Sequence, residues 1–273
     1  TSVRAGLKYL VFAIGGAAFA FVGMAYLMAE GFSLDFVLGG TVSTTEKVNT
    51  YLVIYLMMFF GFGVKAGIFP LHYWLPSASV APTPVTSILH AVAVVKAGVF
   101  AVIRLTWYGF DIDFIRETWA HNIALIFVIF TILYGSVMAI KRRHWKLKMV
   151  YSTVSNLSYI LFSALLLTPL GLAAALLHMA FHAVMKILAF FCVGAVQEES
   201  GAIYISELNG MGRKMPITFA CYTIAAAAMT GIPLFCGFVS KYNILLAAAN
   251  YADGSAWLGA GAILVSALMT AVY

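Results

Sequence analysis

Two histidines and a lysine share one face of a predicted helix that is otherwise apolar. They are His178, His182 and Lys186 in the stretch LAAALLHMAFHAVMKILAFFCVGAVQ, and their i, i+4 and i+8 spacing aligns them along the helix axis. Imidazole changes its charge near neutral pH, and an ammonium removed from water can also release its proton. This set of residues therefore indicates a chain of groups that hold and pass protons.

Three further lysines, Lys65, Lys96 and Lys241, also fall inside long apolar segments, whereas the ten acidic residues lie in predicted loops or at segment ends. A lysine at the centre of a membrane helix costs about 2.5–3.5 kcal/mol on the insertion scale. Ionisable residues at such positions usually mark ion or proton pathways. Snorkelling of the ammonium towards the headgroups is the alternative for each lysine. His90 joins the set, although a single membrane histidine is often a hydrogen-bonding residue between helices.

Two apolar segments carry helix-breaking residues next to a lysine. The breaking residues are Gly63 and Pro70 in GFGVKAGIFPLHYWLP, and Gly231 and Pro233 in MTGIPLFCGFVSKYN. Proline removes a helix hydrogen bond and clashes with the preceding turn. Irregular backbone at membrane depth is tolerated where it is buried or lines a cavity, and paired broken helices indicate the ion path of a transporter. A simple kink is the alternative for the second segment.

The elements that must position these residues are membrane helices. The chain has 273 residues, of which 63% are hydrophobic and only 10% are charged, and its mean hydropathy is +0.98. Soluble domains contain about 25% charged residues, so we expect one all-α polytopic domain in a lipid bilayer. Eight transmembrane segments are predicted, at 7–28, 50–74, 84–107, 119–140, 150–168, 171–196, 216–249 and 255–273.

The charged residues outside the segments predict the orientation. Nine lysines and arginines fall on one side of the predicted membrane and three on the other. By the positive-inside rule the first side, with loop 141–149, is cytoplasmic, in the cell inner (plasma) membrane. The formal net charge of +6 therefore reflects membrane loops and does not indicate nucleic-acid binding. The three cysteines are scattered in apolar surroundings, so we expect no metal site and no bound cofactor.

Four sequence blocks resemble the family of antiporter-like, proton-translocating membrane subunits. Members occur in respiratory complex I, in multisubunit Na⁺/H⁺ antiporters and in energy-converting membrane hydrogenases. The blocks are VKAGIFPLHYWLPSASVAPTPVTSILHAVAVVKAGVFAVIR (64–104), KMVYSTVSNLSYI (148–160), HMAFHAVMKILAF (178–190) and GIPLFCGFVSKYNIL (231–245), in the order of the family.

This resemblance implies about fourteen helices with two inverted repeats, each containing a broken helix. The chain would then be an internal piece of one transmembrane domain, lacking about five helices before residue 1 and the C-terminal helices after residue 273. Lys65 would be the switching lysine, paired with a glutamate on an earlier helix that this chain lacks. The resemblance also implies relay positions at His90, Lys96, Lys148, His178, His182, Lys186 and Lys241.

We expect from this resemblance a proton-translocating subunit of a redox-driven complex, either NADH:quinone oxidoreductase-like or a membrane hydrogenase. Other membrane subunits would carry out the redox chemistry, because no flavin, nucleotide or cluster motif is visible in this chain. The alternative is a subunit of a multisubunit Na⁺/H⁺ antiporter, and the sequence does not separate H⁺ from Na⁺. A structural membrane scaffold without transport is the third interpretation.

Overall fold

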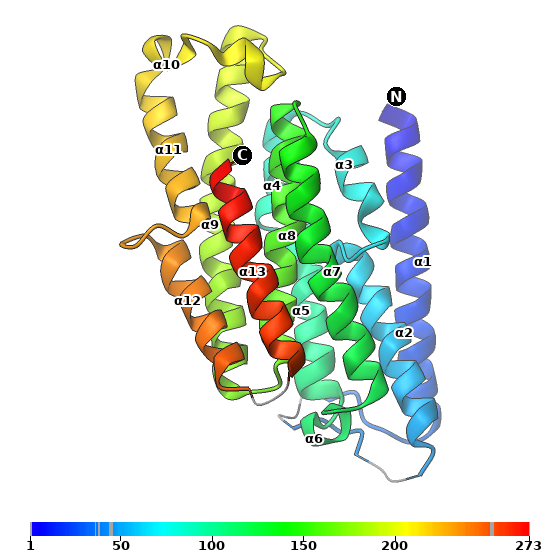
Figure 1. The fold of residues 1–273 in the computed structure, drawn as a ribbon. Helices are drawn as coiled ribbons and strands as arrows, with labels where there is room; N and C mark the ends of the chain where they lie inside the picture. The colour runs from blue at the N-terminus through cyan, green and yellow to red at the C-terminus, as the bar shows by residue number, and fades with distance from the viewer. Residues whose placement is uncertain (1, 36, 38, 44–45, 252–253, 273) are drawn as a thin grey trace.

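The computed structural model describes residues 2–35, 37, 39–43, 46–251 and 254–272, which form one bundle of roughly aligned helices (Figure 1). Three segments consist of two shorter helices each. They are α2 (Val48–Ala66) with α3 (Trp74–Ala78), α4 (Thr83–Ala91) with α5 (Val94–Arg104), and α11 (Pro216–Thr230) with α12 (Cys236–Ala249). The long uninterrupted helices are α1 (Ser2–Ala29), α7 (Trp119–Lys141), α8 (Trp145–Leu165), α9 (Pro169–Ser200) and α13 (Gly254–Val272). The predicted all-α polytopic fold is therefore confirmed.

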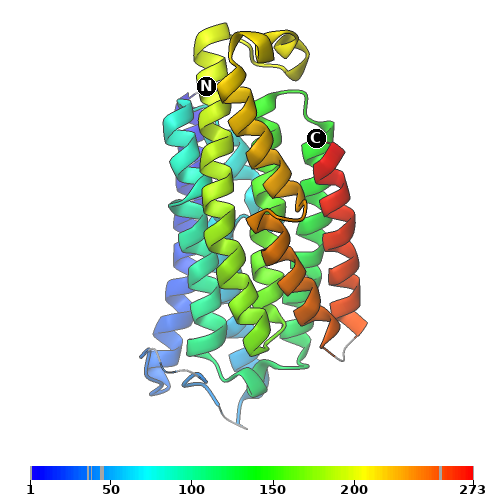
Figure 2. The same cartoon turned by 90° about the vertical axis from the view of Figure 1, so that its left-hand side faces the viewer.

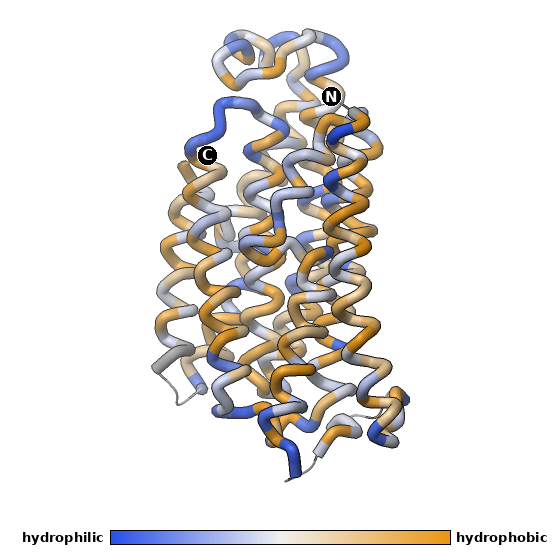
Figure 3. Tube along the Cα trace, turned by 90° about the vertical axis from the view of Figure 1, so that its right-hand side faces the viewer, coloured by the Kyte–Doolittle hydropathy of each residue, from blue (hydrophilic) through white to orange (hydrophobic). Residues whose placement is uncertain are grey.

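Apolar composition explains why most of these helices lie at the outside of the bundle. Five helical segments are long and apolar enough to cross a membrane, among them Trp119–Lys141 and Pro169–Ser200. The more polar α8 is the central helix, and every residue from Lys148 to Leu165 in it is buried. Hydrophilic residues concentrate at the two ends of the bundle, while the stretches between are mostly hydrophobic (Figure 3). This is the arrangement of a polytopic helical membrane protein.

The first broken helix is interrupted between α2 and α3. Gly67 adopts a positive φ of 77° directly after α2, and a short 3-10 helix (Leu71–Tyr73) leads into α3. The break leaves the Val64 carbonyl available, and the Trp74 indole donates a hydrogen bond of 2.7 Å to it. Pro70 lies within the interruption, whereas Gly63 lies in the last turn of α2 beneath Ile68. The backbone therefore leaves the helix at Gly67 while its polar groups stay satisfied.

The second broken helix is interrupted between α11 and α12. Gly231 and Leu234 both have positive φ, at 93° and 80°, and Pro233 lies between them. A side chain at Gly237 would lie 1.8 Å from the Ala228 carbonyl oxygen, so the two half-helices touch closely. In Figure 1 α2 runs from the α6 end (α6, Ile112–Ile115) towards the α10 end (α10, Met211–Lys214), and α11 with α12 runs the opposite way. The two broken helices are antiparallel, as an inverted repeat requires.

A third interruption, at Val92 and Ala93, divides the segment that was predicted to be continuous over 84–107. The Val92 and Ala93 amides both donate to the Ile88 carbonyl, at 3.1 and 2.9 Å, which ends the α4 hydrogen-bond ladder. No glycine or proline marks this site, so nothing in the sequence AVAVVK predicts it. His90 and Lys96 consequently lie on different half-helices.

The loops confirm the division of basic residues between two ends. The chain's N-terminal end, α10 and the 142–144 connection all lie at one end of the bundle, and α6 lies at the other (Figure 1). The nine basic residues of the first side (Arg4, Lys8, Lys141, Arg142, Arg143, Lys146, Lys148, Arg213 and Lys214) belong to the α10 end. The three of the second side, Lys47, Arg104 and Arg116, belong to the α6 end. This arrangement matches the alternation that the sequence predicted.

Candidate functional site

A row of contacting polar side chains crosses the bundle interior from α5 through α9 to α12. Lys96 Nζ lies 3.0 Å from His182 Nδ1. The imidazole of His182 stacks on that of His178, with 5.9 Å between ring centroids. His178 Nδ1 lies 2.8 Å from the Ser240 hydroxyl, which precedes Lys241 in α12. We call Lys96, His182, His178, Ser240 and Lys241 the midplane row.

Helix α9 positions both histidines because its neighbours lie on opposite sides of it. In Figure 2, α4 and α5 lie on one side of α9, and α11 and α12 lie on the other. The i, i+4 spacing directs His178 and His182 towards the bundle interior, where both are fully buried. One helical face therefore links Lys96 on α5 to Ser240 on α12.

Lys241 caps the end of the first half of the second broken helix. Its Nζ donates to the Met229 carbonyl at 2.6 Å and to the Thr230 carbonyl at 3.3 Å, and its side chain is 6% exposed. The C-terminus of a helix carries partial negative charge. The break in the helix therefore creates an acceptor for the ammonium form of this lysine, in a place that is otherwise apolar.

Lys186 is completely buried but points towards the central helix. Its Nζ donates to the Ser152 hydroxyl at 2.9 Å and to the Met149 carbonyl at 3.1 Å. Lys186 shares the α9 face of His178 and His182, yet within the described residues its hydrogen bonds go to α8 and none goes to the row. Lys148, which is also buried, directly precedes Met149 in the first turns of α8. The predicted stack therefore divides into two contacting histidines and a lysine held beside them.

His90 is the most isolated of the predicted relay residues. It is fully buried, it stacks on Phe190 with 5.7 Å between ring centroids, and neither ring nitrogen has a hydrogen-bond partner among the described residues. The same holds for Nε2 of His178 and of His182. Unsatisfied buried polar atoms are rare in native proteins and often mark functional sites. Several imidazole nitrogens of this region therefore have no hydrogen-bond partner within the described part of the chain, which makes them candidates for proton transfer.

Lys65 is placed outside the midplane row. Its side chain is exposed on the surface of the bundle, although it lies in the last turn of α2, at the first broken helix. Its backbone lies against α5, because a Cβ at Gly98 would lie 2.7 Å from the Lys65 carbonyl carbon. Lys65 and Lys96 therefore lie on adjacent helices, with the Lys65 side chain accessible from outside this chain.

Lys96, Lys186 and Lys241 have carbonyl, hydroxyl or imidazole groups as their hydrogen-bond partners in the described part of the chain. The ion pairs found there are Lys47 with Glu30 and Arg116 with Asp113, both at the α6 end. The hydrogen bond from Lys47 lowers the pKa of Glu30. Among the described residues, no group of three or more histidine, cysteine, aspartate or glutamate side chains is placed to bind a metal ion. The lysines of the interior are held by carbonyl, hydroxyl and imidazole groups instead.

The sequence prediction missed Ser152, Ser240 and Tyr159. The first two bind Lys186 and His178, and the Tyr159 ring lies 5.7 Å from the His178 ring and 5.5 Å from Lys241 Nζ. A signal was present in α8, where STVSNLSY (152–159) is polar on a helix surrounded by apolar ones. Its i, i+3, i+4 and i+7 spacing places polar groups on one face.

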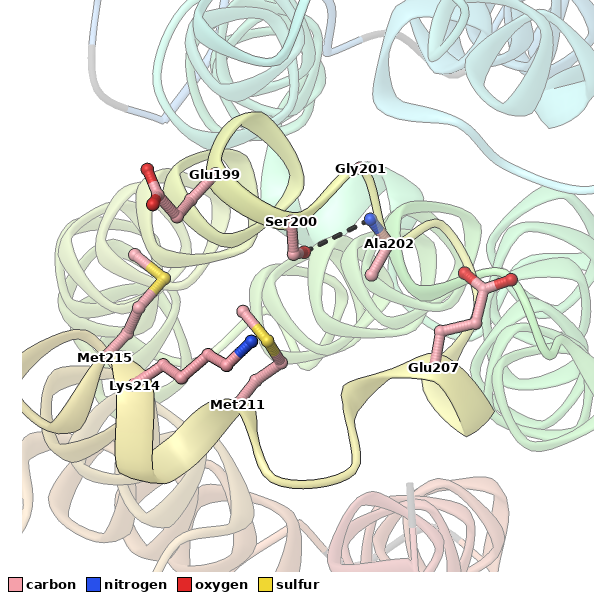
Figure 4. Close-up of a pocket in the computed structure, with 8 residues that line it drawn as sticks. All are labelled: Glu199, Ser200, Gly201, Ala202, Glu207, Met211, Lys214 and Met215. Atoms are coloured by element: carbon pink, nitrogen blue, oxygen red, sulfur yellow. Dashed lines mark hydrogen bonds between the residues drawn. The ribbon is translucent and has the colours of Figure 1, made fainter.

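A cavity of about 710 Å³ lies at the α10 end, apart from the midplane row (Figure 4). It combines two carboxylates, one ammonium and apolar groups, and its lining residues are Glu199, Ser200, Gly201, Ala202, Glu207, Met211, Lys214 and Met215. The Glu207 carboxylate oxygen Oε2 accepts hydrogen bonds from the Ile203 and Tyr204 amides, at 2.7 and 2.9 Å. This cavity contains none of the predicted relay residues.

The fold and the row define a polytopic helical membrane protein whose interior holds a row of buried lysine and histidine side chains from α5, α9 and α12. The chain belongs to the family described as NADH:quinone oxidoreductase/Mrp antiporter, TM, which it matches over residues 1–270. The resemblance stated from the sequence is therefore confirmed.

Two relatives and one solved structure illustrate the family. The chain is 33% identical to NADH-quinone oxidoreductase subunit N of Desulforudis audaxviator, over 100% of this chain and 54% of that protein. It is 37% identical to a probable K⁺/H⁺ antiporter subunit of Rhizobium meliloti, over 83% of this chain and 22% of that protein. A chain in the structure of the Mrp complex from Dietzia sp. DQ12-45-1b matches 98% of this chain with a TM-score of 0.86 at 23% identity, and 50% of that chain is covered. The chain thus spans about half the length, or less, of these relatives.

Proposed function

We propose that this chain forms the proton-translocating part of a subunit in a redox-driven membrane complex of the NADH:quinone oxidoreductase kind. The observation that carries this proposal is the midplane row, in which Lys96, His182, His178 and Ser240 contact one another in a buried place. Intramembrane ionisable groups are costly and are typical of proton relays. The similarity to a NADH-quinone oxidoreductase subunit N supports the redox-driven assignment.

The mechanism that we propose moves a proton along the row by changes of charge at its lysines. Lys96 transfers a proton to His182, and the stacked imidazole of His178 passes it on towards Ser240 and Lys241. The α11 carbonyls that contact Lys241 Nζ favour its ammonium form. Release of that proton follows when a neighbouring positive charge appears, because like charges repel strongly in a medium of low dielectric.

Lys65 would start the cycle. Its exposed side chain is available to a carboxylate on another membrane segment, and its backbone contacts α5 next to Lys96. Redox chemistry in other subunits would change the charge of that pair. His90, Lys148 and Lys186 would adjust the field around the row and supply it with protons, because Lys186 lies one turn from His182 on α9.

A subunit of a multisubunit cation/proton antiporter is the second candidate function. The 37% identity to a probable K⁺/H⁺ antiporter subunit supports it. The row itself suits both candidates, because each must move protons through the same buried groups. The two differ in the driving force, which is a redox reaction in the first case and a cation gradient in the second.

We also propose an orientation. The α10 end, with loop 141–149 and most of the basic residues, would face the cytoplasm of a cell whose inner membrane holds the protein. Other membrane subunits would cover the Lys65 face.

Proton and sodium movement in sealed vesicles tests these assignments. The native membrane assembly is compared with its Lys186→Ala variant, with an uncoupler and with a sodium ionophore. Proton uptake that requires a redox substrate and disappears in the variant supports the redox-driven pump. Uptake that requires only a sodium or potassium gradient supports the antiporter. Transport that is unchanged in Lys186→Ala would favour a membrane scaffold.

A further inference from the structure

Three serines on three different helices meet in the bundle interior, next to the midplane row. Ser136 on α7, Ser155 on α8 and Ser266 on α13 are each fully buried. Ser155 Oγ lies 2.9 Å from both Ser136 Oγ and Ser266 Oγ, and Ser136 and Ser266 also bond to each other. The Tyr159 hydroxyl forms a further hydrogen bond with Ser266. We call Tyr159, Ser266, Ser155 and Ser136 the hydroxyl branch.

Tyr159 connects this branch to the row. Its hydroxyl bonds to Ser266, while its ring lies 5.7 Å from the His178 ring and 5.5 Å from Lys241 Nζ. His178 Nδ1 contacts Ser240, but His178 Nε2 is buried without a hydrogen-bond partner among the described residues. Nε2 of His182 is likewise without a partner there, but His178 is the histidine whose ring packs against Tyr159, so its Nε2 is the nitrogen that we assign to proton exchange with the branch.

The chemistry of the branch suits protons. Each hydroxyl has one donor and two acceptor sites. When a proton binds to one oxygen, that oxygen can release its own hydrogen to the next, so one O–H bond forms and one breaks at every step without a net change. The oxygens hydrogen-bond to one another directly, so a dehydrated metal ion does not fit between them in this arrangement. The branch therefore favours H⁺ over Na⁺.

Packing alone is the competing explanation for these serines. Hydroxyl groups do join membrane helices, at about 0.6–2 kcal/mol for each interhelical bond. Such bonds need only two partners, however, and this cluster gathers four hydroxyls, one of which belongs to the tyrosine whose ring packs against His178 of the row. Ser136 Oγ and Ser155 Oγ also lie 2.9 and 3.2 Å from the Ile132 carbonyl oxygen, so each hydroxyl can donate either to this carbonyl or to its neighbour in the branch.

We propose that the hydroxyl branch exchanges protons between the row, at His178 and Lys241, and the α7–α13 side of the bundle. The proposal rests on the proton-translocating function proposed above and adds residues to that path. Ser266 is the centre of the branch, because it contacts Tyr159, Ser155 and Ser136.

Substitution of Ser266 and Tyr159 in the native assembly tests the branch. Ser266→Ala removes the central hydroxyl, and Tyr159→Phe removes the terminal hydroxyl while keeping the ring against His178 and Lys241. We expect each variant to slow proton movement into sealed vesicles by about 100-fold, as for loss of a proton-transfer group. The ratio of the rates in H₂O and D₂O should also differ from that of the unmodified protein. Ser158→Ala is the matched control and should leave the rate unchanged. Among the described residues, this buried α8 hydroxyl donates to the Val154 carbonyl of its own helix and to no group of the branch.

Two outcomes would overturn the branch. One is an unchanged rate per assembled complex in Tyr159→Phe, which decides the matter even where Ser266→Ala does not assemble. The other is a lower melting temperature of Ser266→Ala with an unchanged transport rate and D₂O effect, which is the result expected of packing. If Lys96→Ala slows transport in the same vesicles while these variants retain it, the branch fails and the proposed function stands. If Lys96→Ala also retains transport, both fail.

Discussion

Lys96 Nζ lies 3.0 Å from His182 Nδ1, and this contact joins two helices whose residues are 86 positions apart in the chain. The α4–α5 interruption starts α5 just before Lys96, so that its ammonium enters the interior close to α9. His182 also stacks on His178, so the contact between Lys96 and His182 is the first of the midplane row. A change at either residue therefore acts on the same step of the proposed path.

Substitution of this pair should slow transport in a non-additive way. Lys96→Ala removes the ammonium, and His182→Ala removes its imidazole partner, so each should lower the proton translocation rate by about tenfold or more. The double variant should lose little beyond either single variant, because residues in direct contact do not contribute independently. Proton uptake per assembled complex in sealed vesicles measures all three rates.

The exposed Lys141 offers the matched control for these variants. Lys141→Ala also removes one positive charge but leaves the interior untouched, so its rate should equal that of the unmodified protein. If the fold-decrease of the double variant equals the product of the two single fold-decreases, Lys96 and His182 act independently. That result would contradict a shared step in the midplane row.

The helices could be predicted from the sequence because a segment that crosses the bilayer must be both long and apolar. The eight segments, the two broken helices and the shared face of His178 and His182 all follow from hydropathy, breaking residues and helical spacing. The interruption at Val92 and Ala93 does not, since it contains no proline or glycine and depends on packing of α4 and α5 against other helices.

Contacts between residues that are far apart in the chain could not be predicted from the sequence, for a physical reason. Spacing along a helix gives the face of a residue but not the partner that faces it. Lys186 was therefore placed in one stack with the histidines, whereas its hydrogen bonds go to Met149 and Ser152 on α8. The exposure of Lys65 and the convergence of serines from three helices likewise depend on tertiary packing.

Gly237→Ala should destabilise the second broken helix. The new Cβ would lie 1.8 Å from the Ala228 carbonyl oxygen, so α12 must shift, and overpacking of this kind costs about 1–3 kcal/mol. The shift would also move Lys241 away from the α11 carbonyls and slow transport. Gly261→Ala is the control, because a Cβ there meets nothing within 4 Å. Thermal unfolding in detergent should show a lower melting temperature for Gly237→Ala alone; equal melting temperatures would contradict the close contact.

The stability of the α10 end should fall in mild acid through His144. Burial, and then the charge of Lys146, hold the pKa of His144 below its ordinary value of 6.5. The imidazole therefore binds a proton more readily in the unfolded chain than in the folded one. The contribution of His144 to the free energy of unfolding is complete above about pH 6.5 and is lost as the pH falls below that value. Protonation also removes the Nδ1 acceptor for the Leu147 amide at the start of α8. His144→Asn keeps a capping acceptor without titrating, and it should flatten melting temperatures measured from about pH 8 to pH 5. An unchanged slope in that variant would assign the effect to another group.

Trp74→Phe should weaken the first broken helix more than the same change at Trp119. The Trp74 indole is buried and donates at 2.7 Å to the Val64 carbonyl, which also accepts from the Gly67 amide at 3.2 Å. The substitution therefore removes one of two hydrogen bonds at a buried acceptor, at a cost of about 0.5–1.5 kcal/mol. The Trp119 indole donates at 3.2 Å to the Asn49 side chain at an exposed site, where water can replace it. Melting temperatures of the two variants in the same detergent provide the comparison. Equal losses would mean that the indole bond does not hold the broken helix, and that the Gly67 turn fixes its geometry alone.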